Sequence, residues 1–466
     1  MADDERQGEL ERRLTTRDAT LLTIGSIVGT GIFLTTSDMA RQLPHAGWIL
    51  VVWLAGGLLS LAGALTYGEL GALFPRAGGI YHYLKEAYGP LPGFLYGWTG
   101  FLVIMSGGNA AIAVGSGTYL GAFVPFFAVD HVLVALPVGA WTWTLNGAQV
   151  AAVAAVIGLT AINARGLVAG AGAQNALTWI KAAAIGFLVL AGFLLPARVD
   201  PEWTAPLAGG AGSLLGLLGV AAVSALWTYD GWYGATFSAG EMRDPGRSLP
   251  RGLVYGTLAV TLLYLAVNVV YARALSPAEM AASARIGEDA AAALAGAFAA
   301  RWVAAAILFS TLGCLASTIL YSSRLYAPMA ADGVFFRFVA RIDPVHRVPV
   351  RSLWLQAAWT VLLTVSGTFE QLYTYVVFAA LLFHVATAGA LFVLRRKLPD
   401  ARRPYRVWGY PWTPLAFIAA SLLLIGNTLV ARPVESVAGL ALVATGLPAY
   451  FLWRRRGRPV RTRPRG

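Results

Sequence analysis

The sequence predicts an all-α integral membrane protein with twelve transmembrane helices. Of its 466 residues, 57% are hydrophobic and only 12% are charged, whereas about 25% charged residues is usual in soluble domains. Long apolar runs recur along the chain, and each reaches the ~17–25 residues that cross a bilayer. Lys and Arg gather in alternate loops, as they do on the cytoplasmic side of membrane proteins.

The twelve spans follow directly from the spacing of charged residues. Three long apolar segments are 92–124, 146–163 and 166–196, the last containing Lys181, and a fourth, 213–240, contains Asp230. These runs do not alternate in polarity as the strands of a membrane barrel do. The other eight spans contain no Asp, Glu, Lys or Arg: 19–37, 46–68, 252–272, 302–323, 352–369, 371–394, 407–431 and 436–453.

The net charge of +12 is explained by topology. With the N-terminus on the cytoplasmic side, the loops on that side hold 28 Lys and Arg and the opposite loops hold six. This asymmetry predicts that both termini are cytoplasmic. We therefore expect contact with a lipid bilayer and none with nucleic acid.

Several function classes are excluded by what the sequence lacks. It has no nucleotide-binding loop, no metal-ligand cluster and no nucleophile paired with a base, so we expect neither an enzyme nor an ATP-driven pump, and no cofactor. The single cysteine, Cys314, allows no internal disulfide. The first apolar run follows a charged leader and ends without a small-residue cleavage pattern, so we expect no cleavable signal peptide.

Two spans are interrupted where a simple helix would be uniformly apolar. Residues 25–31 of span one read Gly-Ser-Ile-Val-Gly-Thr-Gly, and residues 228–231 of span six read Thr-Tyr-Asp-Gly. Interruptions at corresponding places in two halves are typical of transporters built from inverted repeats. The expected organisation is a tail (1–14), a first repeat of helices 1–5 (15–197), a second repeat of helices 6–10 (206–397), helices 11 and 12 (407–454) and a basic tail (455–466).

A broken helix exposes backbone groups that lipid cannot satisfy, so they must face protein, water or a ligand. The N–H groups of Gly29, Thr30 and Gly31 suit a carboxylate, and the carbonyls near 25–27 and 227–229 suit an ammonium group. An α-amino acid carries both. The alternative is close helix packing through Gly25 and Gly29, which are four residues apart.

At these residues the chain resembles the amino acid-polyamine-organocation superfamily, most closely its L-type amino acid transporter branch. The resemblance covers nearly all twelve spans, and its motifs are specific in their order and spacing rather than singly. They are the glycine-rich run 25–33, Tyr-Gly-Glu-Leu at 67–70, Phe-Pro-Arg-Ala-Gly-Gly at 74–79, Trp-Thr-Tyr-Asp-Gly-Trp at 227–232, Glu-Met-Arg-Asp-Pro at 241–245, Arg-Ser-Leu-Pro at 247–250, Ser-Ser-Arg at 322–324 and Ala-Asp-Gly at 331–333.

The resemblance implies a five-plus-five inverted repeat, alternating access and an amino-acid substrate between broken helices one and six, with Trp227 as a gating lid. Two departures limit it. The usual paired Glu after span six is Gly240–Glu241 here, and the external loop lacks the Cys that binds a glycoprotein partner, so we expect no disulfide-linked heavy chain. The substrate-binding residues predicted are Ser26, Ile27, Gly29, Thr30, Gly31, Trp227, Thr228, Tyr229, Asp230 and Gly231.

Other polar residues within the spans are weighed individually. Lys181 lies too deep to reach the surface and, by the resemblance, takes the place of the ion in sodium-coupled relatives; the alternative is a structural tie to carbonyls. Ser317, in a stripe with Ser310 and Cys314, is its predicted partner, although ordinary interhelical hydrogen bonds explain the stripe as well. Asp230 either caps the broken helix ends or has one of three functional roles: contact with the substrate ammonium group, selection of a cationic side chain, or proton coupling.

Asn109 and His384 are lone polar residues in apolar spans. For each of them the sequence favours packing with a satisfied hydrogen bond over a functional role.

We therefore expect a sodium-independent secondary transporter of amino acids in a bacterial inner membrane, working by exchange or by proton-coupled uptake, which both remain open. The alternatives are a transporter of polyamines or other organic cations, made plausible by Asp230, and a transporter-like amino acid sensor.

Overall fold

The computed structural model describes residues 14–43, 45–75, 78–138, 141–165, 183–201, 203, 211–340, 343 and 348–456. Within them, nine helical stretches are long and apolar enough to cross a membrane. The predicted all-α membrane class is confirmed at this level. The stretches contain α3 (Ala46–Leu73), α5 (Pro90–Thr99) with α6 (Met105–Leu120), α7 (Gly147–Ala164), α9 (Ala211–Tyr229), α10 (Pro245–Ala274), α12 (Ile286–Ser322), α15 (Phe369–Lys397), α16 (Trp412–Ala431) and α17 (Pro433–Arg456).

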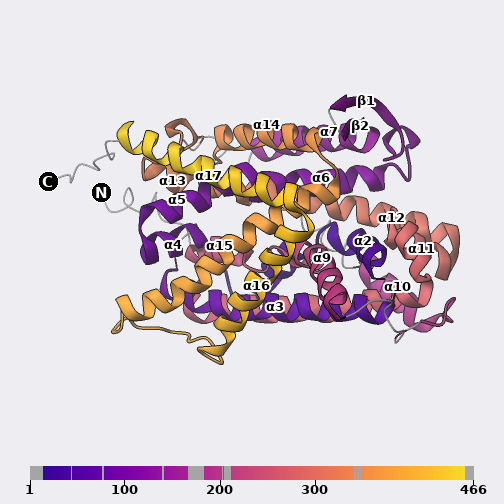
Figure 1. Cartoon of the computed structure of the whole chain (residues 1–466), viewed down its shortest axis with the longest axis horizontal. Coiled ribbons are helices and arrows are strands. Elements are labelled where there is room, and N and C mark those ends of the chain that lie inside the picture. The colour runs from indigo at the N-terminus through magenta and orange to yellow at the C-terminus, as the bar shows by residue number, and fades with distance from the viewer. Residues whose placement is uncertain are drawn as a thin grey trace.

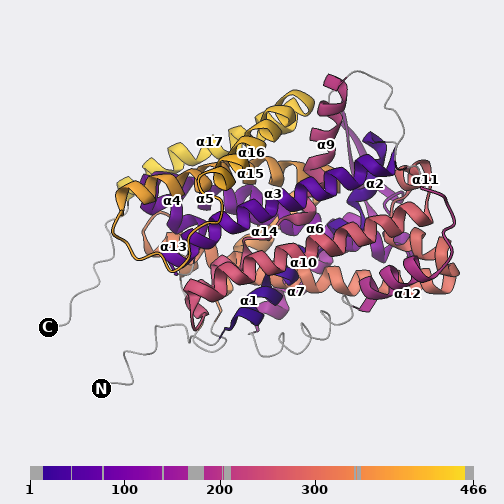
Figure 2. The ribbon, with the colours of Figure 1, turned by 90° about the horizontal axis from the view of Figure 1, so that it is seen from below.

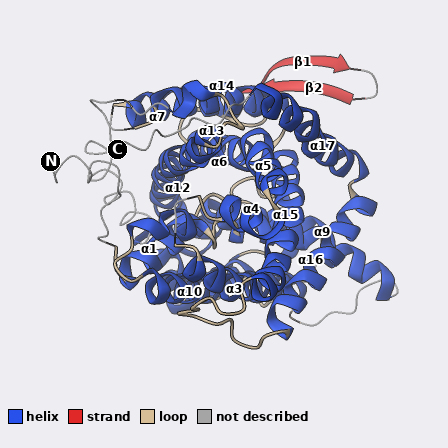
Figure 3. Cartoon of the chain, turned by 90° about the vertical axis from the view of Figure 1, so that its left-hand side faces the viewer, coloured by secondary structure: helices blue, strands red, loops and turns tan. Residues whose placement is uncertain are grey.

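The helices form one bundle whose long axis runs across Figure 1. We call the left side of this view, where α17 ends, the terminal end. The opposite side, where a β-hairpin described below projects, is the hairpin end. Seen along the bundle, α6 lies inside and α7, α14 (Val350–Ser366), α16 and α17 lie outside (Figure 3). Burial agrees with this: 94% of the most apolar window of the α5–α6 stretch is buried, against 28% for α16 and for α17.

Three predicted spans are not among these nine stretches. Span 19–37 is divided into α1 (Thr16–Ile27), a 3-10 turn η2 (Gly31–Phe33) and α2 (Thr35–Gln42). Span 352–369 corresponds to α14, which has 17 residues. Most of span 166–196 lies outside the described residues, and 183–194 is a short apolar helix. The count of twelve and the repeat boundaries stay predictions.

Both predicted interruptions coincide with helix ends. Helix α1 ends at Ile27, and Val28 after it is extended (φ −73°, ψ 96°). Helix α9 ends at Tyr229, Gly231 has φ +97°, and the chain continues as the 3-10 segment η5 (Gly234–Glu241). Helix α1 packs against α10 and η5, below α3 in Figure 2.

Side-chain caps set where several helices begin. Thr15 caps α1 reciprocally with Asp18, Asn146 caps α7 with Gln149, and Thr368 caps α15 with Gln371. Each pair satisfies backbone N–H groups that the first turn of a helix leaves unbonded. The same arrangement begins a short helix at the hairpin end, α11 (Pro277–Ala282).

A β-hairpin projects from the hairpin end where the sequence predicts an external loop. Strands β1 (Val132–Val138) and β2 (Trp141–Asn146) pair antiparallel. The indole N–H of Trp143 donates to the carbonyl of Val365 at 2.8 Å, which ties the hairpin to α14. The first strand is continuously apolar, whereas the second, Trp-Thr-Trp-Thr-Leu-Asn, alternates as a half-buried strand does, a signal that the prediction of a simple loop did not use.

The terminal end is held by a buried ion cluster. The carboxylate of Glu69, on α3, is 0% exposed and accepts from Arg395 Nε (2.9 Å) and Nη2 (2.7 Å) and from the N–H of Val407 (2.7 Å). Arg403 lies 3.5 Å from it and is 7% exposed. The cluster joins α3 to α15 and to the segment before α16.

Short elements complete the chain. A π-helical turn, η3 (Gly100–Ile104), separates α5 from α6, and turns of this kind are frequent at functional sites. The others are α4 (Ile80–Tyr88), η4 (Pro125–Phe127), η6 (Ser323–Leu325), α13 (Tyr326–Ala331) and η7 (Arg337–Ala340).

Candidate functional site

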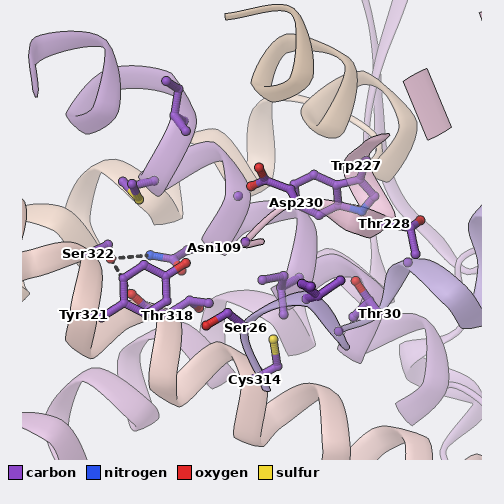
Figure 4. Close-up of a pocket in the computed structure, with 18 of the residues that line it drawn as sticks. Ser26, Thr30, Asn109, Trp227, Thr228, Asp230, Cys314, Thr318, Tyr321 and Ser322 are labelled. Atoms are coloured by element: carbon purple, nitrogen blue, oxygen red, sulfur yellow. Dashed lines mark hydrogen bonds between the residues drawn. The ribbon is translucent and has the colours of Figure 1, made fainter. Parts of the chain in front are cut away.

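A cavity lies where the two broken helices meet α6 and α12. Its empty volume, including its opening, is about 560 Å³. Figure 4 shows side chains from all these elements around one space. The lining residues are Ser26, Ile27, Gly29, Thr30, Gly31, Ile104, Met105, Gly108, Asn109, Ile112, Trp227, Thr228, Asp230, Gly231, Tyr233, Cys314, Thr318, Tyr321 and Ser322.

The first break leaves backbone donors at the cavity wall. The N–H groups of Gly29, Thr30 and Gly31 donate to no other described residue, because helical bonding stops at Val28 and resumes with Phe33, which donates to Thr30. The hydroxyl of Thr30 is buried and also lacks a partner among the described residues. These groups precede α2, whose positive end adds to their attraction for an anion.

The carbonyls freed by the break are divided between protein and cavity. The hydroxyl of Tyr264 donates to the carbonyls of Ile27 (3.1 Å) and Thr228 (3.3 Å) and so joins the two breaks. Tyr271 and Tyr119 donate to Ile32 and Phe33 at 3.1 and 2.8 Å. By contrast, the carbonyls of Gly25 and Ser26, at the end of α1, accept no hydrogen bond from the described residues. Ser26 lines the cavity whereas Gly25 is not part of its lining, so the carbonyl of Ser26 is the one available to a cationic group there.

Glycines allow the two breaks to touch. A Cβ on Gly31 would lie 2.4 Å from Thr228 Oγ1, and one on Gly231 would lie 2.5 Å from the carbonyl oxygen of Ser26. Thr228 also bonds Thr35 on α2, with 2.8 Å between the hydroxyl oxygens. A glycine of each broken helix therefore packs directly against the other broken helix.

Trp227 lines the cavity and packs against α15. Its indole stacks on Tyr373 of α15, with ring centroids 6.0 Å apart and planes 21° from parallel. The hydroxyl of Tyr373 donates to Asp38 at 2.9 Å and lies 3.0 Å from Ser224 Oγ. The role of Trp227 as a lid stays a prediction.

Asp230 lies between two cavities. It lines the central cavity and also a second one with Trp232, His384 and Phe417. His384 behaves as the sequence favours, since its Nδ1 is 2.7 Å from the hydroxyl of Tyr67. Asn109 lines the central cavity, and its side-chain amide donates a long hydrogen bond, of 3.5 Å, to Ser322 Oγ.

Of the ten predicted substrate-binding residues, all except Tyr229 line the cavity. Tyr229 is fully buried, and its hydroxyl donates to the carbonyl of Trp53 at 3.1 Å. Ser317 is not in the lining either, and its hydroxyl donates to the carbonyl of Gly313 at 2.8 Å. Lys181 lies outside the described residues, so its role and its pairing with Ser317 stay predictions.

The sequence missed the wall formed by α6 and α12. On α12 the lining residues are Cys314, Thr318, Tyr321 and Ser322. The last three follow Cys314 by four, seven and eight positions, which places all four on one face of the helix. The stripe predicted from the sequence, Ser310, Cys314 and Ser317, was assigned to Lys181 and not to the cavity, and it shares Cys314 with this wall.

The arrangement favours binding over covalent chemistry. No group of three or more His, Cys, Asp or Glu side chains that could hold a metal occurs among the described residues. A profile of the family described as amino acid permease matches residues 14–449. The chain belongs to this family. It is a permease and not an enzyme.

The relatives of this permease match it almost end to end. It is 28% identical to the serine/threonine exchanger SteT of Bacillus subtilis (strain 168), over 94% of this chain and 96% of the relative. It is 28% identical to the mouse b(0,+)-type amino acid transporter 1, over 92% of this chain and 85% of the relative. It is 29% identical to the human large neutral amino acids transporter small subunit 2, over 92% of this chain and 78% of the relative.

Proposed function

We propose that this permease moves α-amino acids by alternating access and holds them between the two broken helices. The observation that carries the proposal is that the cavity lining combines unbonded N–H groups, at Gly29, Thr30 and Gly31, with the unbonded carbonyl of Ser26. A carboxylate binds the first set and an ammonium group the second, so the zwitterion needs no fixed counter-charge.

The remaining wall contacts the amino-acid side chain. Asn109, Thr318, Tyr321 and Ser322 present polar groups there, while Ile104 and Ile112 present apolar ones. A wall of this composition accepts small neutral side chains. Asp230 adds a carboxylate beside the ammonium group, as substrate ligand or as proton acceptor.

The finer architecture belongs to the same proposal. It comprises twelve spans, a five-plus-five inverted repeat, both termini in the cytoplasm and a bacterial inner membrane, with the hairpin end outside. The charge asymmetry of the loops supports the orientation, and the full-length match to a Bacillus protein supports the origin. The single cysteine sits in the cavity wall, which supports function without a disulfide-linked heavy chain.

The proposal is tested by uptake of labelled L-alanine into proteoliposomes, either empty or preloaded with unlabelled amino acids, with and without an inward proton gradient. Because the zwitterion site is formed by the backbone and needs no sodium, we expect uptake in sodium-free buffer. Uptake that depends on preloading identifies an exchanger with Lys181 as a fixed cation; uptake into empty vesicles that rises with the gradient identifies proton symport. No uptake in either regime contradicts the proposal and favours polyamines, which Asp230 would attract.

Cys314 offers a direct check on where the substrate sits. Its sulfur lines the cavity, 3.3 Å from the position of a Cβ on Gly29. A small methanethiosulfonate reagent is expected to inactivate transport, and an amino acid at ten times its Kd is expected to slow inactivation about tenfold by occupying the same space.

The control is Cys314→Ser, which keeps a small polar side chain and leaves the chain without cysteine. Its transport should resist the reagent. Equal inactivation rates with and without amino acid in the unmodified protein would place the substrate elsewhere.

A further inference from the structure

A separate cavity opens among the helix ends beyond Trp227. Its empty volume, including its opening, is about 350 Å³. Its walls are formed by α2, the middle of α9, the first turn of α15 and the last turn of α16. The polar lining residues used below are Asp38, Ser224, Glu370, Tyr373, Asn427 and Arg432.

One aromatic pair divides this cavity from the central one. Tyr373 lines the outer cavity and Trp227 lines the central cavity, and the two rings stack on each other. A molecule in the outer cavity is therefore one ring layer away from the substrate site, on the route that movement of this pair would open.

The outer cavity carries both signs of charge. Glu370 Oε1 lies 2.5 Å from Arg432 Nη2, and these side chains are 38% and 34% exposed. Asp38, only 13% exposed, is paired with Arg41 and accepts from Tyr373. The buried Oδ1 of Asn427 receives no hydrogen bond from the described residues, which provides one more acceptor.

The Glu370–Arg432 pair is half-buried, and both side chains line the outer cavity. A ligand that offers a carboxylate to Arg432 and an ammonium group to Glu370 replaces each partner with a group of the same charge, so neither side chain is left unpaired. The guanidinium can bind a carboxylate through two parallel N–H donors, and Glu370 can then accept from an ammonium group.

We propose that the outer cavity is a second amino-acid site, which binds the zwitterion before it passes Trp227. Arg432 binds the carboxylate, and Glu370 with Asp38 binds the ammonium group. The inference rests on the proposed function and orientation, because it concerns the same substrates arriving from the outside.

The test compares the two membrane faces with labelled L-serine in right-side-out and inverted membrane vesicles. In Arg432→Gln and in Glu370→Gln, the KM from the outside is expected to rise about tenfold, as loss of a hydrogen bond to a charged group predicts. The KM from the inside is expected to change less than twofold, because substrate from that face meets the central site first.

The matched control is Arg198→Gln. Arg198 forms an ion pair at the same end with Glu279, through bonds of 2.9 and 2.7 Å, and neither residue lines the outer cavity. Hydrogen bonding from Arg198 lowers the pKa of Glu279 to about 2, so this pair stays ionised at every assay pH. Both KM values of the control should equal those of the unmodified protein.

An unchanged outside KM in both cavity variants would overturn the proposal, and so would an equal rise on both faces, which indicates a shift in the gate instead of a lost site. Vesicle content of each variant is checked so that KM is compared among folded proteins. Absence of L-serine and L-alanine uptake by the unmodified protein would contradict the proposed function itself, a result distinct from either failure of the outer site.

Discussion

Replacing Gly231 with alanine is expected to abolish amino-acid uptake. Gly231 has φ +97°, in the left-handed region, where a side chain costs roughly 1–2 kcal/mol. The added Cβ would also lie 2.5 Å from the carbonyl oxygen of Ser26, which is backbone and cannot rotate away. The two broken helices would have to separate, and the ammonium-binding carbonyls would move with them.

Uptake per amount of protein in the membrane measures this effect, with Gly216→Ala as the control. Gly216 lies on the same broken helix, in α9, but a Cβ there meets nothing within 4 Å, so uptake should stay within about twofold and stability should rise slightly. If Gly231→Ala transported normally, the close contact between the breaks would be refuted.

The second large effect is expected from Glu69→Ala. Removing this buried carboxylate leaves Arg395, Arg403 and the N–H of Val407 without their shared acceptor. Breaking a buried ion pair from one side costs about 3–5 kcal/mol. In detergent, the unfolding temperature of the variant should be well below that of the unmodified protein. It is measured by the loss of the monodisperse size-exclusion peak on heating.

Two comparisons make this result specific. Glu86→Ala removes an exposed carboxylate from α4 and should leave the unfolding temperature unchanged. Glu69→Gln keeps an acceptor for the N–H of Val407 but not the charge, so its unfolding temperature should fall between the two. An unfolding temperature for Glu69→Ala equal to that of Glu86→Ala would show that the cluster does not hold the terminal end together.

The sequence located the breaks because glycine acts locally. Gly25, Gly29 and Gly31 within seven residues weaken any helix, and Asp230–Gly231 interrupts an otherwise apolar run. Both signals are local and do not depend on how the rest of the chain packs. For that reason nearly all of the predicted cavity residues on these two segments lie where expected.

The opposite wall could not be predicted in the same way. The window around α6 is 94% buried, so no polar face indicates which side of the helix meets the cavity. On α12, moving one residue from Ser317 to Thr318 changes the direction by about 100°. Packing among segments distant in sequence decides whether Asn109 faces the cavity, and the local sequence does not indicate it.

The unbonded amides of Gly29, Thr30 and Gly31 also determine which experiments can detect the site. Alanine scanning deletes side chains and leaves every backbone N–H in place, so Thr30→Ala would remove a hydroxyl but not the donor beside it. At Gly29 and Gly31 an alanine adds a Cβ, which on Gly31 would lie 2.4 Å from Thr228 Oγ1, so the scan would report a clash there and not the loss of a donor. Exchange of a single amide for an ester, introduced by semisynthesis or by an α-hydroxy acid at position 30, removes one donor and keeps the side chain. That is the perturbation to which a site made of main chain responds.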